Sequence, residues 1–302
     1  MVYYSARGLT RVRVLITGGT GFIGQHVAAN LQRKGHSTLI LDRHGGYSTE
    51  PNNTVLGDVR DVALVDAAVS DSDGVIHLAA VLGTQETINE PEIAAQVNIM
   101  GSLNVFEAIA RYKLPAVYIA VGNYWMNNPY SISKTAAERF ALMFNKERGT
   151  RIAVVRAYNA YGPGQKAAPV RKIIPNFILS ALKDEEITVY GTGAQLMDMI
   201  YVEDVAEILV RALEHGPEPA VYEAGTGTGY PVKEIAKLVI ELVGSGRIRH
   251  TEMRPGETEN SKVVANPRTL RPLGHFNFLS LREGLMLTLP YYEQQVQSGG
   301  RV

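Results

Sequence analysis

The chain has 302 residues, no cysteine, and 30 basic and 30 acidic side chains that cancel. Disulfides and cysteine-ligated zinc are therefore excluded, and no overall charge favours a nucleic acid or an acidic membrane. The seven histidines are scattered without the spacing of metal ligands, so we expect no metal site. Neither the N-terminal MVYYSARGLTRVR nor any later stretch has the apolar run of a signal peptide or membrane span, which predicts a cytoplasmic protein acting on small molecules.

Short apolar runs alternate with helical patterns through the first half of the chain. Runs that are apolar nearly throughout, as in strands buried on both faces, occupy residues 12–17, 37–42, 74–80, 116–121 and 151–157. Apolar residues recur at three and four, as in helices, over residues 22–34, 92–111 and 129–146. This alternation predicts the α/β class with a doubly wound parallel sheet.

The pattern loosens from about Gln165, where prolines and glycines gather. We expect residues 1–165 to form one domain and residues 166–302 a smaller, less regular one, with 199–226 returning to the sheet. The second part contains a helical pattern at 173–183 and a short strand at ITVYG. Its last helix opens with a capping-box pattern at Ser280 and Glu283.

The string TGGTGFIG follows the first strand and opens the first helix. Gly18 permits the tight turn, Gly21 lets the backbone approach a pyrophosphate, and Gly24 lets the helix pack closely on the sheet. The placement predicts a dinucleotide site on a Rossmann sheet.

Charged residues after the next strands bear on the choice of dinucleotide. Asp42 ends the second strand, where a carboxylate accepts hydrogen bonds from a ribose 2′-hydroxyl and repels a 2′-phosphate. NAD is therefore favoured over NADP. Arg43 either holds such a phosphate or is a solvated loop charge. Asp58 either lies at the adenine, with its adjacent backbone, or caps a turn.

Tyr130 and Lys134 lie four residues apart on a predicted helix and would share one face. Asn128 fits the N-cap of that helix and Pro129 its first turn. A free tyrosine has a pKa near 10, and a neighbouring ammonium lowers it by favouring the phenolate. The pair is therefore a candidate acid–base centre beside a dinucleotide.

These motifs together resemble the extended short-chain dehydrogenase/reductase family, in particular its nucleotide-sugar epimerases and dehydratases of the UDP-glucose 4-epimerase type. The resemblance covers nearly the whole chain. It is carried by TGGTGFIG, GDVRD, HLAA (77–80), VNIMGSLNVFEA (97–108), PYSISKTAAE (129–138), RAYNAYGPGQ (156–165), MIYVEDVAE (199–207) and RPGE (254–257).

The resemblance implies that Tyr130 takes a proton from a sugar hydroxyl while the carbon beneath gives a hydride to NAD, and that Lys134 holds the nicotinamide ribose. Positions that match cofactor contacts in the family are Gly18, Gly21, Phe22, Ile23, Gly24, Asp42, Arg43, Asp58, Val59, Leu78, Ala79, Ala80, Asn98, Tyr130, Lys134 and Tyr158. Positions that match contacts to the nucleotide sugar are Asn159, Lys172, Arg254 and Glu257. The family also implies a homodimer through helices 92–111 and 129–146.

The chain departs from the family at three places. No hydroxyl residue stands at Val121, Gly122 or Asn123, where the family has a serine or threonine. The connection from there to Tyr130 is short, and a phosphate-binding arginine is replaced by Met197. Asn123 is either the substitute donor or a turn residue.

The same segment limits the reaction. Tyr124 and Trp125 either form a sugar-stacking wall or pack. Elimination and decarboxylation lose support, because carboxylates used for them in the family are replaced by Asn123 and Tyr124. A sugar 4-epimerase is the leading hypothesis. The alternatives are a keto-sugar reductase or dehydrogenase, a decarboxylase or dehydratase, and a non-catalytic NAD-binding module, and the nucleotide and sugar stay open.

Overall fold

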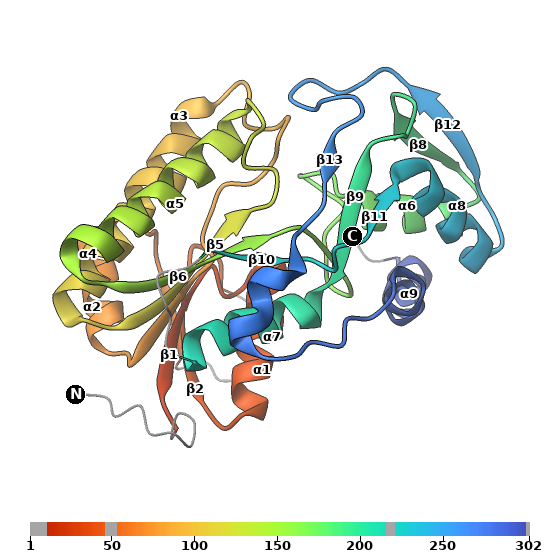
Figure 1. The fold of residues 1–302 in the computed structure, drawn as a ribbon. Coiled ribbons are helices and arrows are strands. Elements are labelled where there is room, and N and C mark those ends of the chain that lie inside the picture. The colour runs from red at the N-terminus through yellow and green to blue at the C-terminus, as the bar shows by residue number, and fades with distance from the viewer. Residues whose placement is uncertain (1–10, 46–52, 216–220, 300–302) are drawn as a thin grey trace.

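The computed structural model describes residues 11–45, 53–215 and 221–299. Its larger unit is built on a seven-stranded parallel sheet (Figure 1). Its strand order is β10-β6-β5-β4-β1-β2-β3, and each neighbouring pair is parallel. The strands are β1 (Arg13–Thr17), β2 (Ser37–Asp42), β3 (Thr54–Leu56), β4 (Gly74–His77), β5 (Pro115–Val121), β6 (Arg151–Ala157) and β10 (Val221–Ala224). The predicted doubly wound sheet is confirmed. The N-terminal segment 1–10, in which we expected no signal peptide, lies outside the described residues.

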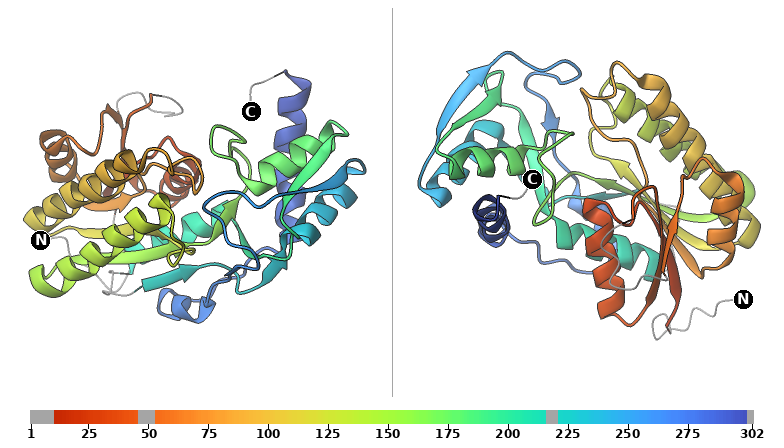
Figure 2. Two further views of the ribbon diagram at one scale, coloured as in Figure 1. Left: turned by 90° about the horizontal axis from the view of Figure 1, so that it is seen from above. Right: turned by 180° about the vertical axis from the view of Figure 1, so that it is seen from behind.

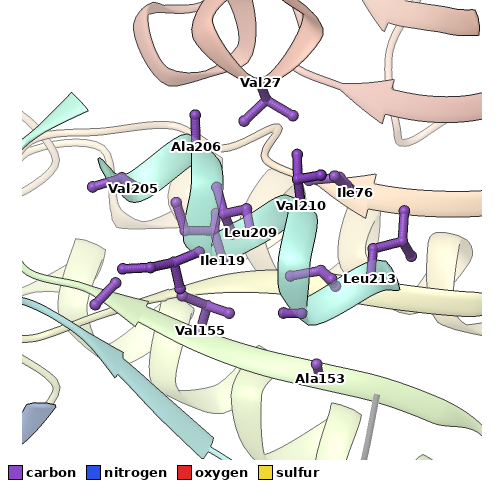
Figure 3. Close-up of a cluster of buried hydrophobic side chains, with 14 of the residues drawn as sticks. Val27, Ile76, Ile119, Ala153, Val155, Val205, Ala206, Leu209, Val210 and Leu213 are labelled. Carbon is purple, nitrogen blue, oxygen red and sulfur yellow. The ribbon is translucent and has the colours of Figure 1, made fainter. Parts of the chain in front are cut away.

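Helices cover both faces of this sheet, as its nearly uniform apolar strands require. One face carries α1 (Phe22–Arg33) and α7 (Val202–Glu214). The other carries α2 (Val62–Ser70), α4 (Ser102–Tyr112) and α5 (Pro129–Arg148). The two sides are visible together from above in Figure 2. Figure 3 shows the apolar side of α7 between Val27 of α1 and the strand residues Ile119 and Val155.

The C-terminal elements build a smaller unit. A four-stranded sheet joins β7 (Asn159–Tyr161), β9 (Leu196–Tyr201), β11 (Gly229–Pro231) and β13 (Lys262–Val263), and β8 (Glu186–Tyr190) pairs with β12 (Arg247–Thr251). Around them lie α6 (Ile173–Leu182), α8 (Val232–Val243) and α9 (Leu281–Gln297), whereas the 3-10 helix η3 (Pro267–Leu273) packs on α7 and β10 of the large sheet. The capping box of Ser280 and Glu283 at the start of α9 is present. Within 199–226, α7 and β10 pack on or join the large sheet, whereas β9 belongs to the small one.

Asp198 on β9 ties the two units together. Its fully buried carboxylate accepts hydrogen bonds from the backbone and hydroxyl of Thr226, from Gly227 N and from Ala265 N at 2.7 to 3.1 Å. Its carbonyl accepts one from Asn159 Nδ2 at 3.0 Å. Because a buried carboxylate needs such donors, the loop after β10 and the segment after β13 are fixed to β9.

The expected continuous helix over 92–111 is interrupted. The segment has an α-helical turn at α3 (Pro91–Ala94), a π-helical stretch at η2 (Ala95–Gly101), and then α4. The buried Asn98 lies in the π stretch, and its amide donates to and accepts from the backbone of Val81. A side chain drawn out of the helical repeat to a neighbouring loop accounts for the wide turn.

Among the described residues, one helical segment has the length and apolar composition of a membrane span, contrary to our expectation that no stretch approaches it. It covers residues 91–112, and half of its most apolar window is buried. This segment packs on α5 and α2 against the sheet. A core helix of a folded domain has the same composition, and the packing explains the apolar side chains.

Candidate active site

The turn between β1 and α1 has the shape that a pyrophosphate requires. Gly18 has a φ of +73°, and a Cβ there would lie 2.8 Å from the backbone N of Ala79. A Cβ on Gly24 would lie 2.5 Å from the carbonyl oxygen of Gly18. The first turn of α1 has no acidic residue, and its N-cap, Gly21, has no side-chain cap. The free N–H groups of this helix start are therefore available to an anion.

Asp42 lies at the end of β2, beside this turn. Its carboxylate accepts hydrogen bonds from Thr20 N at 3.1 Å and His44 N at 3.2 Å. These two backbone donors fix the carboxylate at the cavity edge, as the ribose role requires. Arg43 also lines the cavity, and its side chain is exposed.

Asp58 follows β3 and pairs with Arg60, whose guanidinium donates to both carboxylate oxygens. The hydrogen bond from Arg60 lowers the pKa of Asp58. Since the carboxylate is engaged in this turn, the backbone of Asp58 and Val59 is the part left to meet an adenine. Both residues line the cavity.

Tyr130 and Lys134 lie in the first turns of α5 and face one cavity. Asn128 caps the helix by accepting a hydrogen bond from Ser131 N at 2.9 Å. Burial raises the pKa of Tyr130 to about 12, and burial lowers the pKa of Lys134 to about 7 against the opposing charge of Glu138. The Lys134 Nζ is buried, has no hydrogen-bond partner in the described structure, and lies 4.2 Å from the Tyr118 ring centroid. An unpartnered ammonium at this place fits the ribose hydroxyls of a dinucleotide.

The cavity has a volume of about 760 Å³ and spans both units of the fold. Nearly every residue predicted from the sequence for the site lines it. These are Gly18, Gly21, Phe22, Ile23, Gly24, Asp42, Arg43, Asp58, Val59, Leu78, Ala79, Ala80, Asn123, Tyr130, Lys134, Tyr158, Asn159, Lys172, Arg254 and Glu257.

Asn98 is the exception. Its side chain does not line the cavity, because the amide is held by the backbone of Val81 and by Ser133 Oγ at 2.9 Å. Asn98 thereby fixes the loop after β4 to α5, instead of offering its side chain to a cofactor.

The position of the missing hydroxyl is closed by an aromatic ring. A Cβ on Gly122 would lie 2.7 to 2.9 Å from three ring atoms of Tyr158, so a serine would not fit there without displacing the ring. Asn123 lines the cavity, and its Nδ2 lies 3.5 Å from the sulfur of Met126. Asn123 is thus the polar side chain that this loop presents to the cavity.

Tyr124 and Trp125 do not line the cavity in the described structure. The Tyr124 ring packs 3.9 Å from the guanidinium carbon of Arg156. Tyr124 therefore packs in the described structure, and the sugar-stacking wall stays a prediction.

The substrate half of the cavity contains two facing cations. Burial lowers the pKa of Lys172, with Glu86 opposing the effect and Arg254 adding to it. Arg254 pairs with Glu257, and its Nε is buried without a hydrogen-bond partner. Met197 lines the same region, so a thioether stands where the family has an arginine. An anionic group between Lys172 and Arg254 would complete this arrangement.

Among the lining residues that sequence reasoning missed are Thr84, Glu86 and Tyr190. Tyr190 lies 5.0 Å from the Arg254 guanidinium and accepts a hydrogen bond from Arg171. The loop after β4 that carries Thr84 and Glu86 has no periodic pattern. Only the rule that ligands bind outside the carboxyl ends of parallel strands could have pointed to it.

The fold and the site together define a dinucleotide-binding protein with a buried tyrosine–lysine pair in its cavity. The model of the NAD-dependent epimerase/dehydratase family matches residues 14–225, and the chain belongs to this family. The predicted resemblance and the predicted NAD cofactor are confirmed.

Relatives that the chain resembles differ in the reactions that their names give. It is 26% identical to a UDP-N-acetyl-alpha-D-glucosaminuronate decarboxylase of Bacillus cytotoxicus, over 93% of this chain and 98% of that protein. It is 27% identical to a putative UDP-glucose 4-epimerase of Methanocaldococcus jannaschii, over 90% and 95%. A solved structure of Thermus thermophilus UDP-glucose 4-epimerase with NAD has a TM-score of 0.84 and 28% identity, over 93% and 99%. The family is thereby shown, and the particular reaction is a separate question.

The preference between dinucleotides is testable at Asp42. Because its fixed carboxylate opposes a 2′-phosphate, we expect NAD to bind at least about tenfold more tightly than NADP, or roughly 1.4 kcal/mol. Asp42→Ala should narrow this ratio, whereas Asp58→Asn, which alters the carboxylate paired with Arg60, should keep it. Titration calorimetry measures all six affinities, for NAD and for NADP in each of the three proteins. Equal affinities in the wild type would refute the role of Asp42.

Proposed function

We propose that the protein is an NAD-dependent epimerase that inverts C4 of a nucleotide-activated sugar through a transient 4-keto intermediate. The observation that carries this is the state of the four carboxylates that line the cavity in the described residues. Asp42 and Asp58 are held at the cofactor end, Glu86 accepts from Arg171 N, and Glu257 pairs with Arg254. Epimerisation needs no acid or base beyond Tyr130. Elimination needs a further acid and a further base, and the four carboxylates of the cavity are already engaged.

Tyr130 removes the proton from the C4 hydroxyl and later returns it. Its hydroxyl holds its proton tightly in the free protein, since burial raises the pKa to about 12. The ammonium of Lys134 favours the phenolate. Bound NAD would supply the hydride chemistry at C4, and Gly18, Asp42 and Lys134 would hold it in the cavity. The amide of Asn123 donates to the sugar oxygen in place of a hydroxyl.

The test compares two variants at this centre. Tyr130→Phe removes only a hydroxyl, so NAD binding should persist while turnover falls at least about a hundredfold. Asn123→Ala should cost less, roughly ten- to a hundredfold. Turnover is followed by mass spectrometry and chromatography with a panel of UDP-, dTDP- and GDP-sugars. Turnover of Tyr130→Phe within a few-fold of the wild type would exclude this mechanism.

Decarboxylation is the second candidate, because a relative that covers 93% of the chain is a decarboxylase. It begins with the same oxidation at C4, so the Tyr130 variant does not separate the two reactions. Mass spectrometry does, since a decarboxylated product loses carbon dioxide and an epimer keeps its mass. A reductase would consume NADH, and a non-catalytic binding protein would give no product with any sugar.

The diphosphate of the substrate lies between Lys172 and Arg254 in this proposal, because both cations face the cavity and Arg254 Nε has no partner in the described structure. Arg254→Ala should weaken nucleotide-sugar binding at least about tenfold while NAD affinity stays unchanged. Arg249→Ala is the matched control, since Arg249 is exposed and lies on β12 outside the cavity. Calorimetry with UDP and with NAD measures the two affinities in the wild type and in each variant. Equal loss of UDP affinity in the two variants would contradict the assignment.

We also propose a cytoplasmic homodimer. Exposed apolar side chains follow the outer faces of α3, η2 and α5, at Ile93, Met100, Ile132, Phe140 and Met143. Light scattering should give twice the monomer mass, and the double variant Met100→Lys, Ile132→Lys should be monomeric, because an isologous contact places each substitution at the interface twice. Met286→Lys, on an exposed position of α9, is the control. A monomeric wild type would exclude this proposal.

A further inference from the structure

A row of buried and half-buried charges extends from the acid–base pair to the edge of the large sheet. Lys134 and Glu138 lie one helical turn apart on α5 and are 2% and 3% exposed. Arg156 of β6 donates to both oxygens of Glu138, from Nε at 3.0 Å and from Nη2 at 2.5 Å. Glu223 of β10 lies 3.6 Å from the other side of the guanidinium. The signs of the four charges alternate.

Glu138 is the only anionic group among the described titratable side chains that face Lys134. The others are Tyr118 of β5, His77 of β4, and Tyr130. Burial raises the pKa of Tyr118, and burial together with the charge of Lys134 lowers the pKa of His77 to about 3, so both rings are neutral near pH 7. The Lys134 ammonium therefore depends on Glu138 for its electrostatic stabilisation in the free protein.

Arg156 also reaches the loop before α5. Its guanidinium carbon lies 3.9 Å from the centroid of the Tyr124 ring, at a distance typical of a cation–π contact. Tyr124 follows Asn123 directly, and its carbonyl accepts a hydrogen bond from Thr135 Oγ1 of α5 at 3.2 Å. Arg156 thus connects the helix that carries Tyr130 and Lys134 to the loop that carries Asn123.

A buried carboxylate–guanidinium pair is costly, and apolar side chains of similar size often give equal or greater stability. Stability is therefore a weak reason for these residues. We propose that Glu138 and Arg156 are positioning residues of the acid–base centre: Glu138 keeps Lys134 charged, and Arg156 holds both Glu138 and, through Tyr124, the Asn123 loop. Their effect on turnover rests on the proposed function, whereas their effect on Lys134 can be measured by cofactor binding alone.

The first experiment follows NADH affinity between pH 5.5 and 9 by fluorescence titration. If the ammonium binds the ribose, wild-type affinity is constant at low pH and declines as the pH rises above about 7, the pKa of Lys134. Glu138→Gln should move the start of this decline at least about one pH unit lower, because the loss of the opposite charge disfavours the charged form of the buried amine. The NADH affinities of the wild type and of Glu138→Gln should become equal at the lowest pH, where Lys134 is protonated in both. A merely structural loss would weaken binding equally at every pH.

Glu107→Gln is the matched control for this measurement. It removes an exposed ion pair between Glu107 of α4 and Arg148 at the end of α5, 2.6 Å long in the wild type, and should leave the pH profile unchanged. A Glu138→Gln profile that overlays the wild type would overturn the proposal. If Glu138→Gln does not fold by circular dichroism, Glu138→Asp keeps the charge and withdraws it by one methylene. A smaller shift of the pH profile of NADH affinity in the same direction would support the proposal. An unshifted profile would overturn it.

The second experiment tests the connection to the loop through turnover. Tyr124→Phe keeps the ring beside Arg156 and should keep kcat within about twofold of the wild type. Tyr124→Leu removes the ring and should lower kcat roughly tenfold at unchanged NADH affinity, because Asn123 loses its fixed position. Equal kcat in both variants would overturn this part. Failure of the proposed function would differ, since the wild type itself would then form no product while the pH dependence of NADH binding persisted.

Discussion

The ammonium of Lys134 is buried against the ring of Tyr118 without a hydrogen-bond partner in the described structure. Desolvation favours the neutral amine, so the surrounding groups must favour the charged form for Lys134 to assist Tyr130. Glu138 does so within α5. In the proposed mechanism, the ribose hydroxyls of NAD supply the hydrogen bonds that Lys134 lacks in the described structure. This requirement links cofactor binding to the chemistry, because the charged form of Lys134, which favours the phenolate of Tyr130, is most stable when the cofactor is bound.

The fold meets this requirement by holding α5 from several sides. Asn128 caps its start, Asn98 bonds Ser133 on its inner face, and Arg156 holds Glu138 two turns after Tyr130. Each contact comes from a different part of the chain, so α5 is fixed in position as well as in direction. The π-helical stretch around Asn98 follows from the same demand, since its amide must reach both the loop after β4 and α5.

Much of the fold and of the cofactor site could be predicted because the signals are local. The apolar strands, the glycine turn after β1, Asp42 at the end of β2 and the capped helix with Tyr130 and Lys134 each lie within a few consecutive residues. The interruption of the helix at Asn98, the ring of Tyr158 against Gly122 and the position of Glu86 depend on contacts between distant segments. A single sequence contains no periodicity that reports such contacts. Tyr124 shows the same limit, because its neighbour Arg156 is 32 residues away in the chain.

The absence of a hydroxyl at the end of β5 follows from the packing around the carboxyl ends of the strands, and not from one position alone. Tyr158 occupies the space beside Gly122, and its ring packs with Met126, Val263 and Ala265 of the substrate side. A serine introduced at Gly122 would have to displace that ring and disturb this packing. In the proposed mechanism, the polar group that faces the reacting sugar oxygen therefore comes from the next residue, Asn123. The position of Asn123 depends on how firmly the short loop that carries it is held. Tyr124 of this loop packs on Arg156 of β6, and this contact connects the loop to the large sheet.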